Sequence, residues 1–295
     1  GYTYLSVRMK RNPLAYGITP KEITSDSSLQ AKSISIITDV ATKLRNCGMI
    51  SFDCPEKEGF MRIRNVGRLA SLFYLKYETI EHFGRCMNPQ MTEEQILAMI
   101  CECSEFEAVK IREEEMDELE GLADEAVLTV KGDLTSPSAK VSLLLQAYIS
   151  RYDPVSFSLQ SDLNTIKQNA GRVFRAVFEI VRSQEWASCS LRALKLCLYF
   201  ERRVWSIEHP LAQFDSIPRQ VSKVLYDKGA KDVQILLEEF DSIELAKICG
   251  QGSKIIPLLR RCIHQFPRIK LDASCQPILP SVLSLKIKFC VDFMW

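Results

Sequence analysis

The chain lacks the short sequence motifs that would assign it an enzymatic activity directly. Its 295 residues contain no G-x-x-x-x-G-K-[ST] phosphate loop and no D-E-x-H or D-E-x-D box. They contain no G-x-S-x-G or H-E-x-x-H motif either. Only a site assembled from scattered residues would leave no such motif. We therefore expect no catalytic site within this chain.

The sequence also lacks a membrane segment and a recognisable start. No run of about 18 apolar residues occurs, so we expect no transmembrane helix and no membrane partner. The first four residues, Gly1-Tyr2-Thr3-Tyr4, include no initiator Met and do not begin a signal peptide. We expect the chain to be part of a longer protein.

Histidine is scarce, with three residues, and the eleven cysteines show no metal-binding spacing. No C-x-x-C pair occurs, and a single residue separates the closest two, Cys101 and Cys103. The odd count also disfavours a disulfide framework in a chain of this length. We expect no metal site. Most cysteines should be small buried side chains in a reducing compartment, for example Cys197, Cys249 and Cys262 among their apolar neighbours.

Neither sign of charge is in excess, because 38 basic residues accompany 37 acidic ones and give a net charge of +1. This balance neither favours nor excludes nucleic-acid binding. A binding surface would have to come from local sorting of charge.

Residues 28–77 predict a helix, a hairpin and a second helix. Gly48 stands where the C-terminal cap of the first helix is expected. Strand-like segments at 49–53 and 60–64 flank a turn-rich stretch, and the whole order is typical of a winged-helix domain. Such a domain either packs against a neighbour or places a helix in a nucleic-acid groove, and the few basic residues favour packing. The helices are predicted from two sets at helical spacing, Ile34, Ile37, Val40, Ala41 and Leu44, then Val66, Leu69, Ala70 and Phe73.

The middle of the chain is predicted to be helical. A Thr92-x-x-Gln95 capping box opens a helix over 93–103. The acidic stretch 113–123 predicts a helix whose carboxylates face solvent, since none stands alone among apolar residues. A helix over 139–150 is strongly apolar, which predicts burial.

The segment 162–184 is the most informative part of the sequence. Its apolar residues form a helical stripe, and five polar residues form a line along the opposite side over about four turns. Arginine and amide groups in such a line could follow the backbone of a single nucleic-acid strand. The other interpretation is a solvated polar face with one ion pair, between Arg175 and Glu179. The line consists of Gln168, Arg172, Arg175, Glu179 and Arg182.

The last third predicts short helices and then strands. Residues 210–267 contain a Gly250-Gln251-Gly252 turn between two helices, where backbone amides could hold a phosphate, although one Gly-x-Gly is weak support. Apolar residues alternate strictly over 283–293 and again over 269–273, which predicts β-strands. Two strands do not build a stable sheet domain, so we expect them to begin a truncated β-sandwich.

Longer motifs in every part of the chain match those of one protein family. They are Gly1–Met9 with Asn12–Ile18, Val66–Tyr74, Ser104–Phe106 with Ile111–Glu115, Leu143–Arg151, Gln168–Arg172, Pro210–Phe214 and Asp292–Trp295. These motifs resemble those of large superfamily-two DExH-box helicases of the activating-signal-cointegrator and spliceosomal U5 types. The resemblance covers essentially the whole chain and is greater for the first type.

The resemblance implies a mainly α fold that follows a motor of two RecA-like domains. The last three of its four domains make up the SEC sixty-three homology unit. The motor and most of the final sandwich would lie outside this sequence. The implied domains are a winged-helix domain at 1–86, a helical bundle with a long ratchet helix at 87–209, a helix-loop-helix domain at 210–267 and the start of an immunoglobulin-like β-sandwich at 268–295.

The resemblance also makes 162–184 the ratchet helix, which crosses the path of the translocating strand. This favours the strand-following interpretation of the polar line. The implied role of the chain is that of a non-motor accessory module, which guides and holds the single strand and is not itself an enzyme. The expected nucleic-acid contacts are Gln168, Asn169, Arg172, Arg175, Arg182, Gly250 and Gly252.

For the parent protein the resemblance implies ATP-driven 3′-to-5′ unwinding. ATP and Mg²⁺ would bind to the motor domains, so we expect no cofactor in this chain. The implied partners are single-stranded RNA or DNA, RecA-like domains of the same protein and other subunits of a helicase complex. The implied location is the nucleus, with the cytosol as a second compartment.

Two alternatives remain open. The chain could be a protein-docking scaffold of a helicase complex that makes no direct strand contact. It could also resemble the endoplasmic-reticulum translocation protein that gives the homology unit its name. We disfavour the second, because that protein needs membrane spans and a J domain, neither of which is visible in the sequence.

Overall fold

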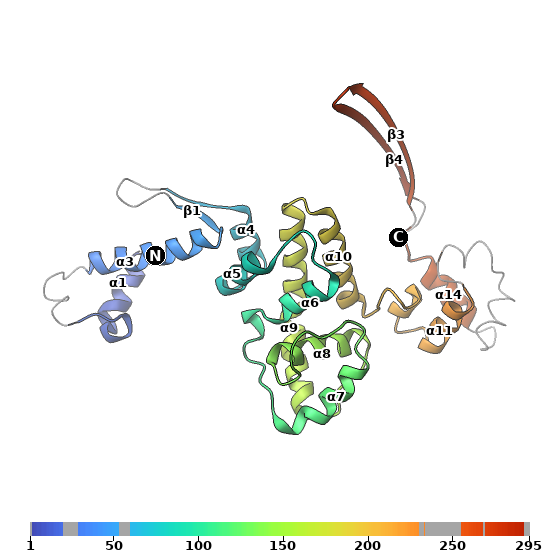
Figure 1. Cartoon of the computed structure of the whole chain (residues 1–295), viewed down its shortest axis with the longest axis horizontal. Coiled ribbons are helices and arrows are strands. Elements are labelled where there is room, and N and C mark those ends of the chain that lie inside the picture. The colour runs from blue at the N-terminus through green and yellow to red at the C-terminus, as the bar shows by residue number, and fades with distance from the viewer. Residues whose placement is uncertain are drawn as a thin grey trace. The chain divides into compact units, whose positions relative to one another are not determined.

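The computed structural model describes residues 2–19, 29–52, 60–229, 233, 255–267 and 269–291. It falls into two compact units, one formed by residues 1–148 and 152–197 and the other by residues 149–151 and 198–295. The described residues are mostly helical, with two small antiparallel sheets (Figure 1). This confirms the mainly α class expected from the sequence. The four domain boundaries stay predictions.

The first unit begins with the predicted order of helix, hairpin and helix. Its elements are α1 (Tyr2–Arg11), η1 (Pro13–Tyr16), α3 (Gln30–Asn46), β1 (Ile50–Phe52), β2 (Met61–Ile63) and α4 (Asn65–Leu72). Just after α3, Gly48 has a φ of +71°, and its N–H donates to the Arg45 carbonyl over 2.9 Å. Glycine adopts this left-handed conformation without a steric penalty, which explains the turn into β1.

The rest of the first unit is a helical bundle. It contains α5 (Tyr77–Cys86), α6 (Glu93–Cys101), η2 (Ser104–Phe106), η3 (Glu113–Glu115), α7 (Met116–Asp124), α8 (Pro137–Ile149), α9 (Phe157–Ser183) and α10 (Ala187–Arg202). The predicted capping box opens α6, because the Gln95 N–H donates to Thr92 Oγ1 (3.3 Å) and the Thr92 N–H to Gln95 Oε1 (3.0 Å). Helix α8 is almost wholly buried, as its composition predicted.

Helix α9 runs for 27 residues without interruption. At 1.5 Å per residue this corresponds to about 40 Å. It begins five residues before the predicted start, since the Glu118 carboxylate accepts the N–H groups of Val155 (2.6 Å) and Ser156 (3.1 Å) just ahead of it. The apolar stripe is buried as predicted, at Leu163, Ile166, Ala170, Val173, Phe174, Val177, Ile180 and Val181, and the burial extends back to Leu159.

One prediction for the bundle was wrong. We expected every carboxylate of the acidic stretch 113–123 to face solvent, but Glu115 is fully buried. Its buried partner Lys140 lies 25 residues away, so the local composition gave no sign of the burial. The stretch also begins as the 3₁₀ turn η3 before it becomes α7.

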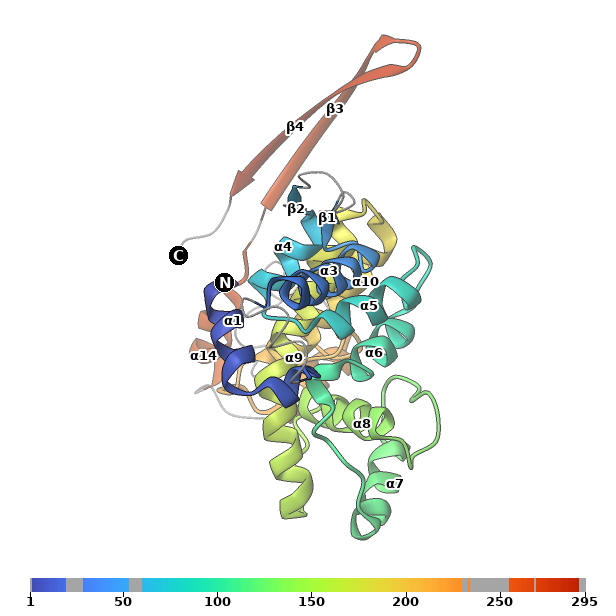
Figure 2. The same cartoon turned by 90° about the vertical axis from the view of Figure 1, so that its left-hand side faces the viewer.

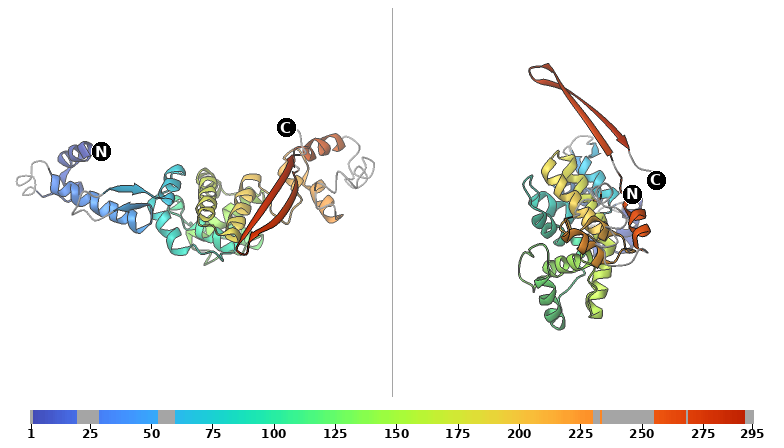
Figure 3. Two further views of the ribbon diagram at one scale, coloured as in Figure 1. Left: turned by 90° about the horizontal axis from the view of Figure 1, so that it is seen from above. Right: turned by 90° about the vertical axis from the view of Figure 1, so that its right-hand side faces the viewer.

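The second unit contains short helices (Figure 3). They surround a small apolar core. Its elements are η4 (Pro210–Gln213), α11 (Arg219–Asp227), α14 (Ile255–Ile263), β3 (Ile269–Leu279) and β4 (Val282–Val291). Leu211, Leu225 and Leu259 are almost inaccessible to solvent in this core. The predicted turn at Gly250 and Gly252 lies outside the described residues.

Strands β3 and β4 form a long antiparallel hairpin (Figure 2). The register confirms the predicted alternation, because apolar residues pair along one face and mostly polar residues along the other, where Lys270 pairs with Cys290. Apart from the half-buried Ser284, every residue of the two strands is exposed. The apolar face consists of Ile269, Leu271, Ala273, Cys275, Pro277, Leu283, Leu285, Ile287, Phe289 and Val291.

No helix among the described residues has both the length and the apolar character needed to cross a membrane.

Candidate nucleic-acid interface on helix α9

The solvent-facing side of α9 carries most of the predicted line. Gln168 is exposed, Arg175 is half-buried, and Arg182 has 65% of its side chain exposed. Glu179 lies within the same line and accepts hydrogen bonds from Arg182, at 2.6 Å from Nη2 and 3.0 Å from Nε. This pair lies on the surface and contributes about 0.3–0.5 kcal/mol at most. Arg182 can therefore leave Glu179 for another anion at little cost.

Asn169 and Arg172 are engaged inside the protein. The Arg172 guanidinium donates from Nη1 to the carbonyl of Phe73 (3.1 Å) and to the carbonyl of Tyr74, and from Nη2 to Asn169 Oδ1 (2.6 Å). Asn169 Nδ2 in turn donates to the Thr165 carbonyl one turn earlier (3.1 Å). Two of the predicted strand contacts thus connect α9 to the end of α4.

The turn that Arg172 contacts has an unusual backbone. Tyr74 has a φ of +52°, although it is not glycine. The Tyr74 N–H donates to the Ser71 carbonyl (3.3 Å) and the Leu75 N–H to the Ala70 carbonyl (2.9 Å), which is the hydrogen-bond pattern of a Schellman cap. A side chain in this conformation costs about 1–2 kcal/mol, so the turn depends on contacts from the surrounding structure.

The first turns of α9 are anchored by a buried ion cluster, which consists of Arg112, Glu115, Lys140 and Asp162. Lys140 Nζ lies 2.6 Å from Asp162 Oδ2, pairs with Glu115 Oε2, and donates to the Lys110 carbonyl (2.8 Å). Arg112 Nη1 bridges the same two carboxylates, at 2.6 Å from Glu115 and 3.1 Å from Asp162. The side chains of Lys140 and Glu115 are fully inaccessible to solvent.

The cluster keeps Glu115 ionised. Burial alone would raise the pKa of this carboxyl, but hydrogen bonds from Lys140, Ser158 and Arg112 outweigh burial and lower its pKa to about 2. The Ile111–Glu115 motif therefore has a structural role here, since its arginine and last glutamate hold α9 against α8. Lys140 stands between the buried Ala139 and Val141, and a lone lysine in so apolar a helix was the one sequence signal for this cluster.

The Ser104–Phe106 motif has a comparable structural role at α5. Glu105 is almost fully buried, and its Oε1 accepts the Lys76 N–H (2.9 Å) at the start of that helix. Its Oε2 accepts the hydroxyl of Thr79. A carboxylate at a helix N-terminus satisfies free N–H groups and interacts favourably with the helix dipole.

In the second unit, two other matching motifs meet. The Arg151 guanidinium donates to the Gln213 carbonyl (3.2 Å) and pairs with the Asp215 carboxylate. The neighbouring Ser150 accepts from Arg219 through its carbonyl (2.8 Å) and from Trp205 Nε1 through its hydroxyl (2.9 Å). The end of Leu143–Arg151 thus fixes the segment around η4.

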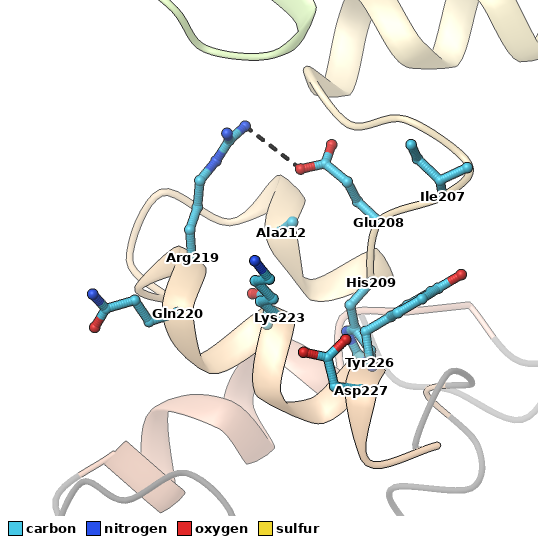
Figure 4. Close-up of a pocket in the computed structure, with 10 residues that line it drawn as sticks. Ile207, Glu208, His209, Ala212, Arg219, Gln220, Lys223, Tyr226 and Asp227 are labelled. Atoms are coloured by element: carbon cyan, nitrogen blue, oxygen red, sulfur yellow. Dashed lines mark ion pairs between the residues drawn. The ribbon is translucent and has the colours of Figure 1, made fainter. Parts of the chain in front are cut away.

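A cavity of about 470 Å³ lies in the second unit between η4 and α11. Arg219 and Glu208 face each other there as an ion pair at 3.8 Å (Figure 4). The Ser222 hydroxyl is buried in its wall and has no hydrogen-bond partner among the described residues. Because acidic and basic side chains both line it, the cavity suits a polypeptide better than a polyanion. The charged residues at this cavity are Glu208, Arg219, Lys223 and Asp227.

The cysteines show no sign of nucleophilic or metal chemistry in the part of the chain that is described. Cys101, Cys103, Cys197 and Cys262 are buried and form no disulfide, whereas Cys86, Cys275 and Cys290 are exposed. Burial raises the pKa of Cys101 to about 12 and also raises that of Cys103. Thiols of this kind are inert side chains of the core. Within the described residues, no group of three or more His, Cys, Asp or Glu side chains could hold a metal ion.

Known proteins with similar sequences match the whole chain. It is 38% identical over 295 residues to the DExH-box ATP-dependent RNA helicase DExH13 of Arabidopsis thaliana, covering 100% of this chain and 13% of that protein. It is 37% identical over 295 residues to activating signal cointegrator 1 complex subunit 3 of Gallus gallus, with the same two coverages. It is 37% identical over 297 residues to the RQC trigger complex helicase SLH1 of Saccharomyces cerevisiae, of which it covers 15%.

The chain therefore spans only a small part of these relatives. A family profile described as the Sec63 Brl domain matches residues 63–295, which is most of this chain. The match begins at the end of β2 and includes α9, the ion cluster and the whole second unit. The chain belongs to the Sec63 Brl domain family, in a form whose relatives include DExH-box helicases.

Proposed function

We propose that this chain is a non-motor accessory module of an ATP-dependent 3′-to-5′ helicase and that it guides the translocating single strand along α9. One observation carries the proposal. Helix α9 is a single rod of 27 residues whose apolar side is buried, and Gln168, Arg175 and Arg182 lie on its other side. The names of the relatives support a helicase as the parent protein and RNA as the strand.

The physical basis of guidance is electrostatic. Guanidinium groups bind phosphate oxygens through charge-assisted hydrogen bonds whatever the base, so the strand can advance without sequence preference. A rod of about 40 Å is comparable with the sites of 4–16 nucleotides that single-strand-binding folds cover. Force would come from RecA-like domains of the parent protein, which would also bind ATP and Mg²⁺. This chain would position and hold the translocating single strand.

Binding of a labelled single-stranded RNA to the 295-residue chain tests the proposal. The double variant Arg175→Glu with Arg182→Glu should weaken binding strongly. Its salt dependence should fall by roughly 1.4 in slope, about 0.7 for each lost phosphate contact. Arg202→Glu is the matched control, because it removes an exposed arginine at the end of α10. In the parent helicase the double variant should lose unwinding while retaining ATP binding.

A docking role is the second candidate, and two features favour it. Helix α3 exposes Ile34 (50%), Ile37 (39%) and Val40 (50%), part of the apolar face that the sequence predicted to pack against a neighbour. The cavity beside η4 has side chains of both signs. RecA-like domains of the same protein and other subunits of a helicase complex, in the nucleus or cytosol, are the proposed partners. Unchanged RNA affinity and unwinding in the Arg175 and Arg182 variant would favour docking over guidance.

A further inference from the structure

We propose that Arg172 is a positioning residue and not itself a phosphate contact. Its hydrogen bonds to Phe73, Tyr74 and Asn169, which we call the clasp, hold α9 against the turn that ends α4. The clasp thereby fixes the strand-facing residues of α9. The inference rests on the proposed function for its consequence, but the clasp is defined by contacts within this chain. It divides the polar line of α9 into residues that face the strand and one residue that holds the helix in place.

The geometry of the guanidinium supports this role. Nη1 donates to the carbonyls of Phe73 (3.1 Å) and Tyr74, and Nη2 donates to Asn169 Oδ1 (2.6 Å). The Asn169 amide is itself oriented by the Thr165 carbonyl. These bonds use both N–H groups of Nη1 and one of Nη2, so a phosphate could bind Nη1 only by displacing two backbone carbonyls.

The turn at Tyr74 explains why a cation is needed there. The C-terminal end of a helix carries a partial negative charge, and its last carbonyls have no partner within the helix. The Schellman hydrogen bonds use the N–H groups of Tyr74 and Leu75 and leave the Phe73 and Tyr74 carbonyls open to other donors. Arg172 supplies those donors, and it does so where a non-glycine residue holds a strained φ.

Other arginines of this chain also donate to backbone carbonyls next to helix ends. Arg192 of α10 donates from Nη1 to the carbonyls of Gln90 (3.3 Å) and Met91 (2.8 Å), just before the cap of α6. Arg219 of α11 donates to the carbonyl of Ser150 (2.8 Å). A lysine at position 172 carries all its donors on one nitrogen, so it cannot reach the two carbonyls and the Asn169 amide oxygen with the planar geometry of the guanidinium.

The clasp has a direct consequence for the strand-facing residues. Gln168 lies one turn before Arg172, and Arg175 lies about one turn after it. Because the clasp holds α9 against α4 at this point, it fixes the position of Gln168 and Arg175 along the helix axis and their rotation about it. Removing the clasp should therefore weaken strand binding indirectly, by allowing the helix to shift against α4.

Hydrogen–deuterium exchange on the full 295-residue chain tests the clasp itself. In Arg172→Ala we expect the amides of Tyr74 and Leu75 to exchange at least tenfold faster, and the unfolding equilibrium constant to rise roughly tenfold or more. Arg172→Lys should behave like Arg172→Ala. Arg182→Ala, the exposed control, should leave both amides unchanged. If Arg172→Ala fails to fold, Asn169→Ala should give the same exchange pattern with smaller amplitude, because it keeps the guanidinium but removes the group that orients it.

Salt dependence of binding to single-stranded RNA separates positioning from phosphate contact. A positioning role predicts weaker binding with an unchanged salt slope in Arg172→Ala, and no rescue by Arg172→Lys. Arg175→Ala, in contrast, should lower the slope by about 0.7. A loss of that size in Arg172→Ala, with unchanged exchange at Tyr74 and rescue by lysine, would overturn the proposal. If the unaltered chain binds no RNA, the proposed function fails, and the exchange data still decide on the clasp.

Discussion

The bundle around α9 and the segment 30–72 that precedes it differ in where they place their charged side chains. In the bundle, Glu105, Glu115 and Lys140 are buried and fully engaged with one another or with backbone groups. In the preceding segment, which contains α3, β1, β2 and α4, Ile34, Val40 and Leu72 are exposed, the last by 67%. Both regions expose apolar residues, among them Phe157 of α9, but of the two only the bundle buries charged side chains among its described residues.

This difference indicates which region fixes its own structure and which presents a surface to another domain or subunit. Buried charges are retained where both partners are satisfied and where a precise arrangement matters, because hydrophobic packing alone is less directional. Exposed apolar stripes mark surfaces that another body covers. We infer that the bundle sets the position of α9 by itself, whereas the segment 30–72 completes its packing elsewhere. Four changes, in order of decreasing effect, would break or sharpen this comparison.

The largest effect should come from Lys140→Ala in the ion cluster. It leaves Glu115 and Asp162 close together and without their buried cation, and breaking such a group costs about 3–5 kcal/mol. Lys195→Ala is the matched control, because Lys195 is 46% exposed and pairs with Glu93 at 3.4 Å, an interaction of at most about 1 kcal/mol. Urea unfolding of both variants measures the difference. Equal losses would show that the buried cluster contributes no more to the stability of the bundle than an exposed ion pair does.

Acid should loosen the bundle next. The pKa of Glu115 is about 2 in the folded chain, below its ordinary value of 4.5, so its contribution is fully present above pH 4.5 and is lost as the pH falls toward 2. The loss is of the order of 3 kcal/mol. The unfolding free energy of the unaltered chain should change little between pH 7 and 4.5 and fall by pH 3, and this fall should be smaller for Glu115→Gln. Parallel curves for the two proteins would argue against the cluster as the acid-sensitive element.

A backbone contact should dominate in the segment 30–72. A Cβ at Gly67 would overlap the Met49 carbonyl oxygen and would lie 3.1 Å from Ile63 Cγ1. Gly67→Ala should therefore cost about 1–3 kcal/mol. Gly121→Ala in α7 meets open space and should stabilise the chain by about 0.5–1 kcal/mol. Thermal unfolding of the two variants should shift in opposite directions, and a shift in the same direction would show that the Met49 contact can relax.

The smallest effect on stability should come from the exposed face of α3. Ile34→Gln and Val40→Gln should each change the unfolding free energy by no more than about 0.5 kcal/mol. Both should nevertheless weaken association of the chain with the RecA-like domains of its parent protein, which a pull-down can measure. A stability loss above about 1.5 kcal/mol would mean that this face is already part of a core.

Much of this fold was predictable because local patterns determine it. Helical spacing, the Thr92 capping box and Gly48 each encode a feature within a few residues, and all three were confirmed. The strict alternation of β4 likewise predicted its strand, although β3 extends beyond the predicted 269–273 because pairing with β4 continues as far as Leu279. The start of α9 could not be predicted, since it depends on the carboxylate of Glu118, which lies 37 and 38 residues before the N–H groups it accepts.

The candidate site was predictable in composition but not in contacts. The spacing placed Gln168, Arg175 and Arg182 on one side of a helix. It could not reveal that Arg172 contacts carbonyls about 100 residues earlier in the chain, because a polar residue at that spacing suits either solvent or a neighbouring helix end. The burial of Glu115 escaped the same reasoning, since its partner Lys140 lies 25 residues away.

The pairing of β3 with β4 restricts how this part of the gene can vary. Successive side chains point to opposite faces. Inserting or deleting one codon within a strand would therefore move every apolar residue after it in that strand to the polar face. Changes of two codons would preserve the facing. The single irregularity in register, between Pro277 and Leu279, lies next to the reversal of the chain. Among homologous genes, length differences of one residue should therefore concentrate between Pro277 and Leu279. The remainder of the β3–β4 hairpin should vary by substitution alone.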